Sequence, residues 1–191
     1  MHTAGAMIST LTNTAVDGIV RYYAGHDRAF HYTVRPGRDG RLHSEGYSLR
    51  YAAISQIGIG CWLKHHPQDV IRLPDLHQKI SDPIHTIDDI GDAALWVWAA
   101  CESRPDAAGE FVGSLIRLWE SQSKGCNAVE LAWVLKACAM VHESCPDQRA
   151  KIEPLMKAAG TQLRGLFSPE AKLFRRHARR GWTEGISGRI A

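Results

Sequence analysis

Apolar positions recur at helical spacing along most of the chain, and they indicate two kinds of helix. One kind is apolar on nearly every side, as in residues 93–100 and 131–135, and such a helix has to be surrounded by protein. The other kind carries a single apolar stripe, as at Phe111, Leu115 and Leu118, which predicts one face in water. The first kind is predicted at 48–64, 87–102 and 127–144, and the second kind follows it at 68–80, 106–122 and 147–166.

A short motif marks the junction inside each pair of helices. The segment Glu-Ser-Arg-Pro-Asp at 102–106 returns as Glu-Ser-Cys-Pro-Asp at 143–147, and a weaker copy, His-His-Pro-Gln-Asp, occupies 65–69. Proline disfavours helical backbone in the residue before it, so the first helix should end there, and the aspartate should cap the second helix. A period of roughly 40 residues is typical of stacked helical hairpins.

The N-terminal region departs from this period. Residues 7–24 predict a leading helix, because Ile8, Leu11 and Ala15 form an apolar stripe. Residues 29–46 then change character, with alternating apolar positions followed by a turn-rich segment at 35–40. This pattern predicts a short β-excursion or ordered loop.

An inner layer of apolar helices inside an outer layer of amphipathic helices is the plan of an α/α toroid. An open solenoid of hairpins is the alternative. We therefore predict an all-α chain, one domain over residues 1–191, whose α/α hairpins form part of a toroid as an incomplete barrel. Only three hairpins are counted, so we expect either self-association or a missing C-terminal half that covers the open edge.

Composition and charge limit the partners and the cellular compartment that we expect for the protein. The formal net charge of +3 is mild, so nucleic acid is not expected as a partner. Five cysteines include no CxxC pair, and the first residues show no basic leader segment, which predicts a reducing cytoplasm. No apolar run reaches the length of a membrane span. We therefore expect no membrane partner.

Three segments bear a resemblance to a known family. Residues 48–54, 91–95 and 130–135 resemble segments of the six-hairpin α/α-toroid, glycosidase-like superfamily, including uncharacterised bacterial members near polysaccharide biosynthesis functions. The likeness spans about residues 8–180 and lies in packing positions. It implies the toroid fold and a carbohydrate-related activity, but it transfers no catalytic residue. The chain departs from the family in length, as an N-terminal half would.

Parallel inner helices would gather their N-termini at one mouth of a toroid. Carboxylates from different helices facing one pocket are what glycoside hydrolysis requires, and an arginine with aromatic rings suits a sugar or an acidic substrate. The alternative is that the acidic residues only cap helix starts, although Arg50 opposes the helix dipole there. The candidate catalytic residues are Asp88, Asp89, Asp92 and Glu130, and the candidate substrate-binding residues are Glu45, Arg50 and Tyr51.

Other candidate chemistry has simpler interpretations. The ten histidines show no HxxxH or HExxH spacing, so no metal is expected. Cys138 and His142 share a helix face, but core packing is the favoured interpretation. Trp96, Trp98 and Trp133 could stack on a sugar, and core packing is again favoured. The basic cluster at 172–180 could hold phosphate or nucleic acid, with a solvated helix face as the alternative.

These observations leave two functional hypotheses. The first is a carbohydrate-active, glycosidase-like protein that binds a saccharide and needs no cofactor. The second is a non-catalytic helical-repeat scaffold that binds a partner through its open edge. Whether the chain is an enzyme is not decided by its sequence.

Overall fold

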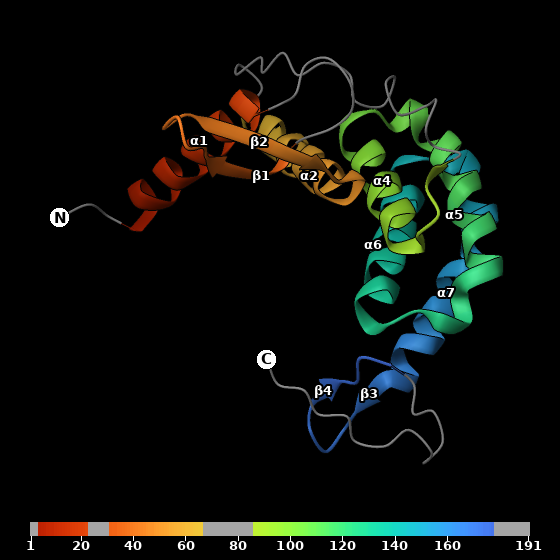
Figure 1. The fold of residues 1–191 in the computed structure, drawn as a ribbon. Coiled ribbons are helices and arrows are strands. Elements are labelled where there is room, and N and C mark those ends of the chain that lie inside the picture. The colour runs from red at the N-terminus through yellow and green to blue at the C-terminus, as the bar shows by residue number, and fades with distance from the viewer. Residues whose placement is uncertain (1–3, 23–30, 67–85, 178–191) are drawn as a thin grey trace.

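A computed structural model describes residues 4–22, 31–66 and 86–177 of the 191-residue chain (Figure 1). The predicted helix at 68–80 and the segment after residue 177 lie outside the described residues. The elements are α1 (Ala4–Tyr22), β1 (His31–Pro36), β2 (Leu42–Tyr47), α2 (Leu49–His65), α4 (Ile90–Ser103), α5 (Ala108–Gln122), α6 (Ala128–Ser144), α7 (Arg149–Leu166), β3 (Phe167–Ser168) and β4 (Leu173–Phe174).

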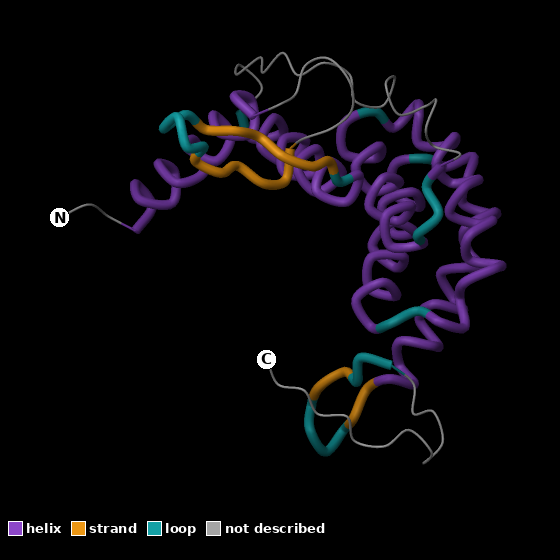
Figure 2. The backbone as a smooth tube through the Cα atoms, in the orientation of Figure 1, coloured by secondary structure: helices purple, strands orange, loops and turns teal. Residues whose placement is uncertain are grey.

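The described part is mostly helical, with two short antiparallel hairpins (Figure 2). The β-excursion predicted at 29–46 is confirmed as the pair β1–β2, in which Thr33 faces Glu45 across the ladder. Gly40 lies in the connecting turn with a φ of 74°, a backbone conformation that favours glycine. No helix in the described ranges is long and apolar enough to cross a bilayer.

The inner helices are parallel neighbours, as predicted. Arg50 at the start of α2 binds Asp89 at the start of α4, and Lys64 at the end of α2 binds Glu102 at the end of α4. The helix α4 packs in turn against α6. The chain follows an arc in which α4 and α6 lie on the inner side and α5 and α7 on the outer side (Figure 1).

The repeat motif produces the same backbone conformation three times. His66, Arg104 and Cys145 each precede a proline, with φ and ψ of −133° and 60°, −150° and 76°, and −130° and 76°. Each N–H donates to the carbonyl four residues earlier, at 3.0, 2.6 and 2.8 Å. The prediction that proline ends the first helix of each hairpin is confirmed at all three junctions.

The prediction that the next aspartate caps the second helix is wrong at the two junctions where that helix is described, and Asp69 lies outside the described residues. Pro105–Ala107 and Pro146–Gln148 form single 3-10 turns, and neither α5 nor α7 has a side-chain cap hydrogen bond. The turns lead the chain into each helix through their own backbone bonds, with Ala107 N donating to Arg104 O and Gln148 N to Cys145 O, both at 3.0 Å. The aspartates remain exposed.

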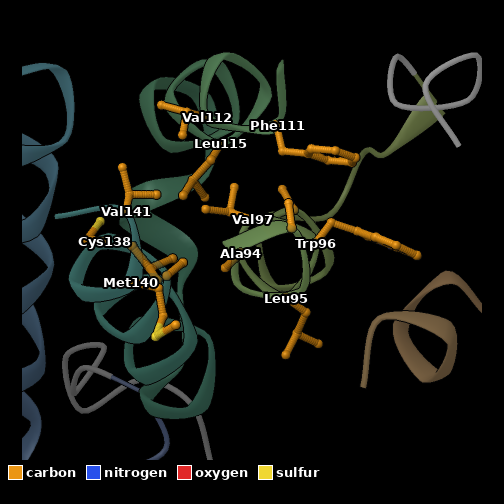
Figure 3. Close-up of a cluster of buried hydrophobic side chains, with 14 of the residues drawn as sticks. Ala94, Leu95, Trp96, Val97, Phe111, Val112, Leu115, Cys138, Met140 and Val141 are labelled. Carbon is orange, nitrogen blue, oxygen red and sulfur yellow. The ribbon is translucent and has the colours of Figure 1, made fainter. Parts of the chain in front are cut away.

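The core is centred on α4. Ten of its 14 residues are buried, compared with six of 15 in α5, so the predicted difference between first and second helices is confirmed for this pair. The Trp96 ring stacks near Phe111 of α5, with ring centroids 6.2 Å apart. Figure 3 shows this cluster together with side chains of α6, including Cys138 and Val141. Trp96 and Cys138 are fully buried, as the core interpretation predicts.

The helix α6 does not match its predicted all-round burial. It is more buried than α7, with six of 17 residues compared with four of 18. However, Ala132 and Lys136 are exposed and Trp133 is half-buried. Because α6 packs on α4 and α7, its remaining side stays open in the described part.

Candidate functional site at the shared start of the inner helices

Each inner helix begins at a side-chain cap, and we refer to the end of the helices that carries these caps as the mouth. Ser48 Oγ accepts from Tyr51 N at 3.3 Å at the start of α2. Asp89 Oδ1 accepts from Asp92 N at 3.0 Å at the start of α4. Asn127 caps α6. The helix starts are therefore built from short polar residues whose oxygens satisfy free backbone N–H groups.

Arg50 joins two of these starts. Its Nε donates to Asp92 Oδ1 at 2.5 Å, and its Nη2 donates to Asp89 Oδ1 at 2.9 Å. The guanidinium also lies over the Trp133 ring, 5.4 Å from the centroid, which allows a cation–π contact with α6. One arginine of α2 thus contacts both neighbouring inner helices, and we call Arg50, Asp89, Asp92 and Trp133 the mouth network.

The close approach of α4 and α6 positions the tryptophan. Gly91 of α4 faces the ring, and a Cβ atom at this position would come within 3.1 Å of Trp133 and of Asp89 Oδ1. A side chain there would push the ring away from Arg50. The glycine therefore permits the contact between the helices that assembles the mouth network.

Burial and charge act in opposite directions in this network. The pKa of Arg50 is raised, chiefly by its hydrogen bond to Asp92. The pKa of Asp92 is also raised, because its burial opposes ionisation more than Arg50 favours it. Burial governs the carboxyl, since only 21% of the Asp92 side chain is exposed. Asp92 thus has a carboxyl that takes up a proton more readily than a free aspartate, next to a fixed cation.

The other predicted site residues lie apart from this network or serve the backbone. Glu130 Oε2 accepts from Asn127 N at 2.8 Å and completes a capping box. Asp88 is exposed, and its carbonyl accepts from Gln122 Nε2. Glu45 is an exposed residue of β2 whose carboxylate lies 3.6 Å from Arg35. Tyr51 is 53% exposed on α2.

Two participants were not predicted for this end of the molecule. Gln122, at the end of α5, accepts from Ile90 N at 3.2 Å through Oε1 and donates to Asp88 O, so its amide fixes the start of α4. No sequence signal singles it out within a polar run. Trp133 was predicted as a core residue or a sugar platform; its half-buried ring packs against the core, and it also lies against Arg50, a contact that was not predicted.

The opposite end of the hairpins holds a pocket of about 360 Å³ between the two Pro-Asp turns. Asp106, Asp147, Ser144 and Gln148 contribute polar groups to its lining, and the Cys145 thiol donates to Pro105 O at 3.4 Å. The lining thus comes from both copies of the repeat motif, at the end where the inner helices finish.

Cys138 and His142, which were considered as a nucleophile and its partner, differ in burial. Burial raises the pKa of Cys138 to about 12, so this thiol stays protonated at neutral pH, while His142 is exposed. Among the described residues, no group of three or more His, Cys, Asp or Glu side chains is placed to hold a metal ion.

Comparison of the chain with models of known protein families found no match, and searches of curated proteins and of solved structures found none either. The comparisons therefore identify no six-hairpin toroid superfamily, and that assignment stays a prediction.

Proposed function

We propose that the chain is a non-catalytic helical-repeat module that binds a partner, and that its hairpins are part of an α/α toroid. The observation that carries this proposal is the pairing of charges at the mouth. Arg50 binds both Asp89 and Asp92, and Asp89 and Glu130 are also engaged in helix caps. These contacts support a role for the candidate site residues in holding the helices together.

The exposed face of α1 supports binding to a partner. Met7, Ile8 and Leu11 are 62%, 64% and 59% exposed. Throughout residues 7–18 no side chain of this helix is buried. A helix whose apolar stripe is left uncovered is marginal in water, because helices gain most of their stability from burying such a stripe. A second surface that covers the stripe would stabilise α1, and a second copy of the chain is the partner proposed.

Sedimentation velocity over a range of protein concentrations tests this proposal. We expect the wild type to associate as concentration rises, and the double substitution Ile8→Gln with Leu11→Gln to remove the association. The substitution Asn13→Gln, at an exposed polar position of the same helix, is the matched control and should behave as the wild type. A wild-type monomer at every concentration would contradict self-association.

A carbohydrate-active, glycosidase-like function is the second candidate, and one observation favours it. Burial raises the pKa of Asp92, as burial does for the general acid of a glycosidase site. Hydrolysis of a panel of polysaccharides, measured for wild type and Asp92→Asn, tests it. Activity that disappears in a variant with an unchanged melting midpoint would support this candidate over the scaffold.

A further inference from the structure

The segment after α7 forms a small, well-anchored hairpin. Phe167 pairs with Phe174 and Ser168 with Leu173 across β3–β4. Arg175 closes the hairpin onto the end of α7, with its N–H donating to Leu166 O at 2.8 Å. Arg176 O then accepts from Ala128 N at 3.0 Å, which ties the chain to the start of α6. The basic cluster predicted as a helix face or anion site therefore begins on a β-hairpin.

The apolar side chains of this hairpin are directed to solvent. Phe167, Leu173 and Phe174 are 40%, 68% and 52% exposed. Because Leu173 and Phe174 are adjacent in one strand, they lie on opposite faces of the hairpin. Both faces therefore carry exposed apolar surface, on an element held in place at both of its ends.

Positive charge surrounds these apolar residues. Residues 164–177 hold four arginines and lysines and one glutamate, so this short segment carries the whole formal net charge of +3. Arg164, Lys172 and Arg176 are exposed, and within the described part of the chain none of them forms an ion pair. The rest of the chain is formally neutral.

We propose that the β3–β4 hairpin docks on an anionic lipid surface, inserting its three apolar side chains below the head groups while the flanking cations bind the phosphates. Burial of apolar surface combined with attraction to anionic lipids is what holds peripheral elements at a membrane. This contact is peripheral. It differs from our sequence-based expectation of no membrane partner, which rested on the absence of a spanning segment.

The geometry favours lipid over other anionic partners. A protein surface would cover one face of the hairpin, whereas lipid can surround an element that is apolar on both faces. Single-stranded nucleic acid would need open ring faces for stacking. Phe167 and Phe174 instead form a pair tilted by 57°, with centroids 5.2 Å apart, so their rings are not parallel platforms for successive bases, and the most exposed member of the set is aliphatic.

Vesicle co-sedimentation of the full chain tests the proposal. We expect binding to vesicles of equal parts phosphatidylcholine and phosphatidylglycerol, and little binding to phosphatidylcholine alone. Lys172→Asn with Arg176→Gln should weaken binding about fivefold per charge, since a basic residue at an anionic surface contributes about 1 kcal/mol. Asparagine is chosen at position 172 because Lys172 has a φ of 54°, in the left-handed region that asparagine tolerates. Arg117→Gln with Lys124→Gln removes the same charge from exposed sites on α5 and on the 3-10 turn that follows it, and should bind as the wild type.

Insertion has its own readout. In a Leu173→Trp variant, the added tryptophan should be quenched by brominated phosphatidylglycerol vesicles, while wild type gives the background from native tryptophans. Any of three results would overturn the proposal: equal weakening by the control pair, adsorption that salt abolishes without added quenching, or binding to a single-stranded oligonucleotide but not to vesicles. A melting curve for each variant verifies that the fold is intact.

Discussion

Replacement of Arg50 by methionine removes the charge from the mouth network while keeping most of the side-chain stem. Asp92 then keeps a mostly buried carboxylate with no counter-charge, because its side chain is 21% exposed and its bond to Arg50 Nε is lost. Exposed ion pairs contribute about 0.2–1 kcal/mol, and leaving a buried charge unpaired costs about 3–5 kcal/mol. Arg50 is 39% exposed, so solvent screening reduces the effect, and we expect the variant to lose about 1–2 kcal/mol of unfolding free energy.

A double-mutant cycle with Asp92→Asn separates the pair from other effects of each substitution. We expect Asp92→Asn alone to change stability by less than about 0.5 kcal/mol, since it removes both the pairing and the cost of burying a charge. The coupling free energy between the two sites should be about 1 kcal/mol in urea unfolding at neutral pH. Lys157→Met, which breaks the exposed pair with Glu153, serves as control and should leave the midpoint unchanged.

The sign of the pH dependence provides a second check. The folded pKa of Asp92 is raised above its reference of 3.8, so protonation of this group favours the folded state as pH falls through that raised value. A protonated Asp92 needs no counter-charge, and the penalty of Arg50→Met should therefore shrink toward acidic pH. A coupling energy near zero, or a penalty that grows on acidification, would refute the view that this network holds the inner helices together.

Three further predictions test the packing. Gly60→Ala should destabilise the protein, because a Cβ atom there would lie 3.0 Å from a side-chain carbon of α4. The control Gly58→Ala, on the same helix, meets nothing within 4 Å and should stabilise the protein by about 0.5–1 kcal/mol. Equal effects of the two substitutions in urea unfolding would contradict the packing of α2 on α4. Trp96→Ala should cost about 3–5 kcal/mol, since the fully buried ring leaves a cavity in α4, and a loss below about 1 kcal/mol would place the ring outside the core. In native thiol labelling followed by mass spectrometry, the exposed Cys61 should react first and Cys138 last; the reverse order would contradict the described burial.

Sequence periodicity predicted the helices well because hydrophobic pattern and proline position act locally. The three pre-proline residues end their helices as expected, since the steric restriction depends only on the next residue. For Arg50 and the aspartates of α4, the sequence predicted only that they lie at the same end of the helices. Their direct hydrogen bonds depend on the distance between α2 and α4, which the sequence pattern does not report. The exposure of Trp133 was not predicted for a similar reason, because it depends on which helices pack against α6.

Two further features of the structure were not predicted from the sequence, namely the 3-10 turns and the hairpin β3–β4. The 3-10 turns displaced Asp106 and Asp147 from the cap positions that their types favour. The hairpin β3–β4 has strands of only two residues each, too short for alternation to be visible in the sequence. Its closure depends on bonds to α6 and α7, which no local pattern reports.

Hydrogen exchange of the α1 amides at low and high protein concentration tests the central claim most directly. Because no side chain in residues 7–18 is buried within the chain, the proposed binding module predicts fast exchange in dilute protein. It predicts slow exchange in α1 when a second copy covers Ile8 and Leu11, while protection of α4 stays the same at both concentrations. Protection of α1 that is already high in dilute protein and independent of concentration would show that the stripe is covered within one chain, and would contradict the proposal.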